Sequence, residues 1–132
     1  MIRPDRVDER WVLVVEDDFL IRASVSASLG DAGYPVREAA NGIEALAQME
    51  RGIPSLVLLD LRMPFVNGWE FVDELRKRGL QLPIYLMTAH PEAHQLSQEL
   101  GACGVLAKPF DLDQLLGLVE RWLGPSVDQP LA

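Results

Sequence analysis

The feature that most constrains the fold is a series of five short apolar runs, spaced almost evenly and separated by stretches of helical length. Each run is as long as a β-strand, and β-branched or aromatic residues are frequent in them. The runs cover residues 11–15, 34–36, 56–59, 84–87 and 105–107. Strands that alternate with helices in this way predict βα units and one parallel sheet.

The stretches between the runs have helical periodicity. The clearest begins after Asp111, a predicted N-cap, and carries one apolar stripe from Leu112 to Leu123 before Gly124 and Pro125 end it. We expect further helices over 21–29, 42–51, 68–78 and 91–100.

Two of the runs, VLVV at 12–15 and LVLL at 56–59, are apolar at every position. This pattern is typical of central parallel strands that are covered by helices on both faces. The expected fold is therefore α/β, a doubly wound five-stranded parallel sheet. Ligands of such sheets lie beyond the carboxyl ends of the strands, so functional residues are expected directly after the runs.

Length and composition exclude several classes of protein. The 132 residues suit one domain, expected at 11–124, with an N-terminal extension at 1–10 and a tail or truncated linker at 125–132. The net charge of −8 disfavours contact with nucleic acid. No run is long enough to cross a membrane, and no secretory signal is visible. The single cysteine, Cys103, fits a reducing compartment, so we expect a cytoplasmic protein.

Polar side chains follow four of the five runs: Glu16, Asp17 and Asp18 after the first, Asp60 after the third, Thr88 after the fourth and Lys108 after the fifth. Three converging carboxylates would need a cation, and hard oxygen ligands favour Mg²⁺ or Ca²⁺. A carboxylate can also attack phosphorus while a metal and a lysine stabilise the phosphoryl oxygens. Asp18 is expected to be a solvated charge at a helix start. The set suffices for reversible phosphorylation of an aspartate.

With these residues in place, the chain resembles the receiver domains of two-component response regulators, which are CheY-like proteins. The matching pieces are VLVVEDD at 12–18, LVLLDLRMP at 56–64, NGWEF at 67–71, YLMTA at 85–89 and LAKPF at 106–110. The resemblance implies the flavodoxin-like fold with strand order 2-1-3-4-5. It also implies a signalling domain that catalyses only its own phosphorylation and dephosphorylation.

The resemblance implies a phosphoacceptor and a metal site. Asp60 matches the phosphoacceptor, and Glu16 and Asp17 match the acidic pair that holds Mg²⁺, or Mn²⁺ in its place. The backbone carbonyl of Arg62 would complete the site. Glu16 stands where aspartate is commoner, and its longer arm suggests a contact with the metal through water.

The resemblance also implies phosphoryl-binding and switch residues. Thr88 matches the switch hydroxyl and Lys108 the lysine that pairs with the phosphoryl group, and the bond between Lys108 and Pro109 is expected to be cis. Val105 departs from the family pattern, which usually has an aromatic residue there. We therefore expect switching to be reduced or to be carried by the 88–95 loop.

Two further positions are expected to modulate the lifetime of the phosphoryl group. Arg62 and His90 match positions that flank the path of the attacking water, and their bulk favours slow hydrolysis. His90 precedes Pro91, a residue suited to the first helical position, so His90 is expected to be a helix N-cap.

The function expected from the sequence is a signalling switch or phosphorelay intermediate. Its donor would be a histidine kinase or phosphotransfer protein, and its downstream protein partner would bind the face formed by 88–123. Alternatives are a phosphorylation-independent scaffold and a receiver fragment of a larger regulator or hybrid kinase. A phosphohydrolase is disfavoured because Arg62 stands where its second acid is needed. Met1 favours a free or N-terminal receiver, whereas the tail resembles a cut linker.

Overall fold

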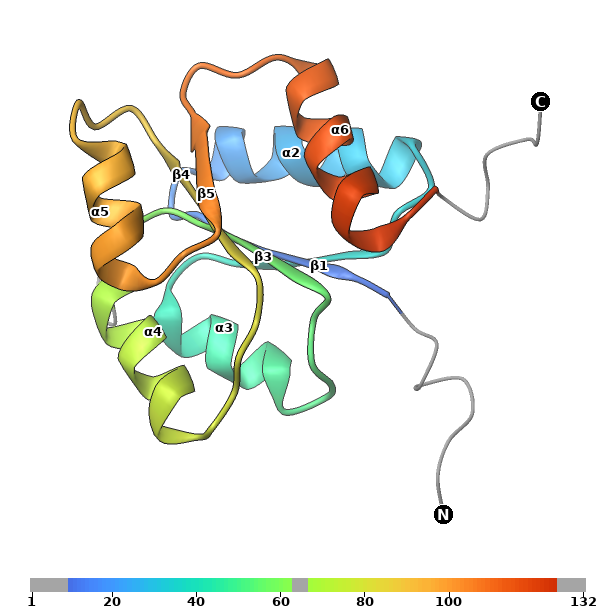
Figure 1. Ribbon diagram of the computed structural model, residues 1–132. Coiled ribbons are helices and arrows are strands. Elements are labelled where there is room, and N and C mark those ends of the chain that lie inside the picture. The colour runs from blue at the N-terminus through green and yellow to red at the C-terminus, as the bar shows by residue number, and fades with distance from the viewer. Residues whose placement is uncertain (1–9, 63–66, 126–132) are drawn as a thin grey trace.

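The computed structural model describes residues 10–62 and 67–125. Five parallel strands form one sheet in the order β2-β1-β3-β4-β5, with helices on both faces (Figure 1). The strands are β1 (Val12–Val15), β2 (Val36–Ala39), β3 (Leu56–Leu59), β4 (Ile84–Thr88) and β5 (Gly104–Ala107). The helices are α2 (Phe19–Asp31), α3 (Gly42–Met49), α4 (Gly68–Lys77), α5 (Ala93–Leu100) and α6 (Leu112–Leu123). The predicted fold class and strand order are confirmed.

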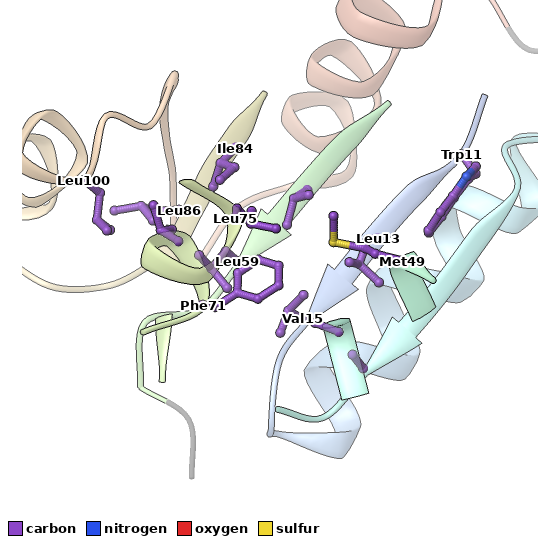
Figure 2. Packing of buried hydrophobic residues seen from close by; sticks show 14 residues of the cluster. Trp11, Leu13, Val15, Met49, Leu59, Phe71, Leu75, Ile84, Leu86 and Leu100 are labelled. Carbon is purple, nitrogen blue, oxygen red and sulfur yellow. The ribbon is translucent and has the colours of Figure 1, made fainter. Parts of the chain in front are cut away.

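The two faces of the sheet bury separate cores because successive side chains of a strand point to opposite sides. Figure 1 shows α2 and α6 on one face and α3, α4 and α5 on the other. Along β1, Val12 and Val14 face α2 and α6, whereas Leu13 and Val15 belong to the opposite cluster. Figure 2 shows that cluster, in which the fully buried Phe71 of α4 lies close to Leu59 and Val15. Both central strands are completely buried, as their unbroken apolar runs predict.

The second strand lies later in the sequence than its apolar run at 34–36 indicates. The strand occupies Val36–Ala39 and pairs in register with β1 at the edge of the sheet. An edge strand needs little burial, so it continues through the polar Arg37 and the exposed Glu38. The apolar Tyr34 precedes the strand, is buried beneath the helices and donates its hydroxyl to the carbonyl of Gly124 at 2.9 Å.

Helix α5 also begins later than predicted, and His90 is not its N-cap. The helix starts at Ala93 after Glu92, which makes no side-chain cap bond. Instead, the backbone N–H of Ala93 donates to the carbonyl of His90 at 3.1 Å, which closes a separate turn before the helix. The Nδ1 atom of His90 accepts from the N–H of Glu92 within that turn at 3.0 Å.

Other helix ends agree with the sequence. Asp111 caps α6 in a reciprocal pair with Gln114, and Gly124 follows the helix with φ +79°. Among the described residues, no helix is both long and apolar enough to span a membrane. The expected N-terminal extension and the end of the C-terminal tail lie largely outside the described residues, as do Met63 and Pro64 of the third matching piece.

Candidate functional site

A cleft of about 530 Å³ lies beyond the carboxyl ends of β1, β3, β4 and β5. All the residues named from the sequence for metal or phosphoryl chemistry line it, together with both expected lifetime modulators: Glu16, Asp17, Asp60, Arg62, Thr88, His90 and Lys108. Val105 is half-buried and packs against the core, outside this lining. The topology thus gathers residues that are up to 92 positions apart in the chain.

The acidic side chains converge because two neighbouring strands end side by side. The N–H of Glu16 donates to Ala39 and the N–H of Asp60 donates to Val15, which extends the sheet by one residue at each strand end. One carboxylate oxygen from each of Glu16, Asp17 and Asp60 lies within 4.8 Å of the others. Glu16 and Asp60 are buried, with 1% and 7% exposed, whereas Asp17 is open to solvent.

Glu16 is held by a close ion pair. Its Oε1 lies 2.6 Å from the Nζ of Lys108, and its Oε2 accepts from the N–H of Asp18 at 3.2 Å. Burial raises the pKa of Glu16 from 4.5 to about 7; the Lys108 bond lowers it in part, and the neighbouring Asp60 raises it further. A proton or a cation at this cluster would relieve the burial and repulsion that raise the pKa of Glu16.

Asp60 directly follows β3, and its neighbour Leu61 contacts the start of α4. Its Oδ1 accepts from the N–H of Arg62 at 3.2 Å. Gly68, at the start of α4, donates to the carbonyl of Leu61 at 3.3 Å. A Cβ on Gly68 would lie 2.6 Å from the Cδ2 of the flexible Leu61 side chain and 3.0 Å from the Leu61 Cα, so an added methyl group would require Leu61 to shift. The NGWEF motif alone does not indicate this close approach of Gly68 to Leu61.

The opposite wall of the cleft comes from β4 and β5. The Oγ1 of Thr88 accepts from the N–H of His90 at 3.0 Å, and the carbonyl of Thr88 accepts from the N–H of Lys108 at 2.9 Å. The peptide bond between Lys108 and Pro109 is cis. A hydroxyl, an ammonium group and three carboxylates therefore face one space.

Asp18 caps a helix at the edge of the cleft, whereas Cys103 lies outside it. Asp18 is exposed and caps α2 by accepting from the N–H of Ile21 at 3.0 Å, in agreement with its expected position at a helix start. Cys103 is exposed and lies away from this cleft.

Arg22 is a site residue that the sequence analysis missed. Its side chain, 15% exposed, reaches from the first turn of α2 to the backbone of the acidic pair and to Glu38 on β2. Helical periodicity does not reveal such a contact, because the side chain bonds to carbonyl oxygens that every sequence has. The sequence pattern that could have indicated this contact is an arginine five positions after Asp17 together with an acidic residue, Glu38, on the next strand.

The donor set fits a hard divalent cation. Three carboxylates within 4.8 Å supply only oxygen ligands, which Mg²⁺ prefers, and the open side at Asp17 leaves room for water or a phosphoryl oxygen. The amino group of Lys108 at the same place would stabilise additional negative charge. The arrangement can hold a cation next to a carboxylate nucleophile.

Comparisons with known proteins agree with this reading. Residues 12–120 match the family model described as the response regulator receiver domain. The chain is 34% identical over 114 residues to the sporulation initiation phosphotransferase F of Bacillus subtilis, covering 85% of this chain and 92% of that protein. It is 38% identical to the transcriptional regulator NtrC of Salmonella typhimurium, covering 89% of this chain but 26% of that protein.

Solved structures show the same likeness. The chemotaxis protein CheY4 of Vibrio cholerae superposes with a TM-score of 0.77 at 39% identity, covering 86% of this chain and 98% of that chain. The receiver domain of NtrX from Brucella abortus superposes with a TM-score of 0.77 at 32% identity, covering 87% of this chain and 99% of that chain.

Proposed function

Because this chain belongs to the family of response regulator receiver domains, we propose that Asp60 is its phosphoacceptor. The donor is the phosphohistidine of a histidine kinase or phosphotransfer protein. The observation that carries the proposal is the convergence of Asp60 with two further acids in a cleft that also holds Lys108.

The reaction transfers one phosphoryl group. A carboxylate oxygen of Asp60 attacks phosphorus, and the new O–P bond forms as the N–P bond of the donor histidine breaks. The imidazole leaves with the electron pair and takes a proton from solvent. Water later attacks phosphorus, the O–P bond to Asp60 breaks, and inorganic phosphate leaves while the carboxylate is restored. In this reaction the chain catalyses only its own phosphorylation and dephosphorylation.

Mg²⁺ would be held by Glu16, Asp17, Asp60 and the backbone carbonyl of Arg62, with Mn²⁺ as a substitute. When bound, the cation supplies positive charge to the phosphoryl oxygens and lowers the repulsion among the acids. Asp17, the exposed member, would leave a bound cation accessible from solvent.

Lys108 and Thr88 bind the phosphoryl oxygens. The Nζ of Lys108 already lies in the cleft, where it pairs with Glu16, and it exchanges part of this contact for the incoming oxygen. The Oγ1 of Thr88 accepts from the N–H of His90, so its own hydrogen is free to donate to a phosphoryl oxygen. Both groups therefore stabilise the phosphorylated form of Asp60 relative to its free carboxylate.

The same Thr88 contact supports a loop-based switch. Val105 has no ring to reorient, and it packs against the core. If phosphorylation moves the Thr88 side chain enough to break its bond from the His90 N–H, residues 88–95 rearrange; they comprise the end of β4, the connection at 89–92 and the first turn of α5. We assign the conformational change to this loop and to the 88–123 face, where a downstream protein partner binds.

Arg62 and His90 slow the loss of the phosphoryl group. Both line the cleft next to Asp60 and Thr88, where their side chains restrict the approach of water. Removing the side chain of Arg62 should therefore shorten the lifetime of the phosphorylated protein.

The two relatives suggest different cellular roles for this chain. The chain spans most of the length of the phosphotransferase F relative but about a quarter of NtrC, so it acts either as a free relay protein or as the receiver part of a larger regulator. We assign it to the cytoplasm, where the exposed Cys103 would stay reduced.

Incubation with acetyl phosphate and Mg²⁺ tests the phosphoacceptor. The wild type should form an alkali-labile adduct of one phosphoryl group, and Asp60→Asn should form none. Asp111→Asn is the matched control, because Asp111 caps α6 outside the cleft and asparagine also caps helices. Failure of the wild type to react with any donor would favour a phosphorylation-independent scaffold. Steady phosphate release from unrelated monoesters would favour a phosphohydrolase.

A further inference from the structure

The backbone of the acidic pair, Glu16 and Asp17, lies between strand β1 and helix α2. The last sheet bond in this region joins the N–H of Glu16 to Ala39, and the first helical bond joins the N–H of Arg22 to the carbonyl of Asp18. The carbonyls of Glu16 and Asp17 fall between these two bonds. The orientation of the peptide groups that carry both metal-site side chains therefore needs another partner.

The guanidinium of Arg22 is that partner. Its Nη1 donates to the carbonyl of Glu16 at 2.8 Å and approaches the carbonyl of Asp17 at 3.4 Å. Its Nε donates to the carboxylate of Glu38 at 3.2 Å, which ties the other edge of the group to strand β2. The planar guanidinium holds these donors in fixed relative directions, which the rotatable ammonium group of a lysine does not.

We propose that Arg22 is a positioning residue for the metal site, holding the backbone of Glu16 and Asp17 so that their carboxylates converge on Asp60. This inference rests on the proposed function. Groups behind the direct ligands orient them, and their removal typically weakens metal binding about 10–100-fold. Toward the acidic pair, Arg22 donates to the backbone carbonyl oxygens of Glu16 and Asp17.

Because Arg22 is positively charged, its electrostatic effect on a bound cation is opposite in sign to its proposed positioning effect. A positive side chain next to a cation site repels the cation, so its removal should strengthen Mg²⁺ binding if charge were its only effect. If Arg22 positions the pair, its removal should weaken Mg²⁺ binding despite the lost repulsion. The two explanations predict opposite signs.

Calorimetric titration of Mg²⁺ into metal-free protein measures the effect. Compared with the wild type, Arg22→Ala should bind Mg²⁺ about tenfold more weakly or worse, and Arg22→Lys should lie between them. Arg78→Ala is the matched control, since Arg78 also pairs with a glutamate, Glu74, but on α4 away from the cleft. Its affinity should equal that of the wild type.

Urea unfolding with and without Mg²⁺ separates positioning from stability. A merely structural role would lower the unfolding midpoint equally under both conditions, and the rise caused by Mg²⁺ would stay the same. Positioning predicts that this rise shrinks in Arg22→Ala. If the alanine variant does not fold, Arg22→Lys keeps the charge, and weaker binding than in the wild type is still expected.

The outcomes distinguish this inference from the proposed function. Wild-type protein that does not bind Mg²⁺ would overturn the metal site itself. Wild-type protein that binds Mg²⁺, with Arg22→Ala binding equally or more tightly, would overturn only the role of Arg22.

Discussion

The buried Glu16 should make the metal-free protein less stable as the pH rises. Its pKa is about 7 in the folded chain, chiefly through burial, against 4.5 when free. Between about pH 4.5 and 7, Glu16 therefore keeps its proton in the folded state and loses it in the unfolded state. The stabilisation is fully present below about pH 4.5 and is lost as the pH rises through about 7. A difference of this size corresponds to about 3 kcal/mol of unfolding free energy.

The variant Glu16→Gln isolates this effect, since its amide has the shape of the protonated acid and does not titrate. Urea unfolding in EDTA from about pH 5 to 8 should show that wild-type stability falls by up to about 3 kcal/mol relative to Glu16→Gln. The exposed Glu99→Gln variant controls for the loss of one surface carboxylate and should follow the wild type. Added Mg²⁺ should flatten the wild-type profile, because the cation favours the ionised acid.

Parallel stability profiles of the wild type and Glu16→Gln in EDTA would refute this reasoning. Such a result would mean that Lys108, which lies 2.6 Å from Glu16, compensates the burial completely.

Three further predictions concern the fold around the site. Phe71→Ala should lower the free energy of unfolding by about 3–5 kcal/mol in urea titrations, because it empties a fully buried position, whereas the exposed Trp69→Ala should cost much less. Gly68→Ala should cost about 1–3 kcal/mol in the same assay and weaken Mg²⁺ binding, since its Cβ would displace Leu61 next to Asp60; a urea unfolding curve and a Mg²⁺ affinity equal to those of the wild type would contradict this. Structures with and without a bound phosphoryl mimic should differ over 88–95, and a rearrangement centred on Val105 would disprove the loop-based switch.

Much of this fold could be predicted because its central strands are buried on both faces. VLVV and LVLL have no polar position, so both their location and their parallel pairing follow from the sequence. The edge strand β2 could not be located equally well. It exposes Glu38. The nearby apolar residue Tyr34 lies before the strand and packs into the core with residues of α2 and α6.

The candidate site was predicted for a similar reason. Parallel strands bring their carboxyl ends to one edge, so Glu16, Asp60 and Lys108 had to meet if each followed a strand. Contacts that depend on backbone atoms could not be predicted in this way. The bonds from Arg22 to two carbonyls and the turn that replaces the His90 cap have no signal in side-chain periodicity.

Chemical mapping of the phosphorylated residue tests the central claim most directly. Borohydride reduces an aspartyl phosphate to homoserine, and mass spectrometry of the peptides locates that conversion in protein treated with acetyl phosphate and Mg²⁺. The account predicts homoserine at position 60, dependent on Mg²⁺. Homoserine at Asp17 or Asp18, or a phosphorylated protein in which residue 60 is unchanged, would contradict it.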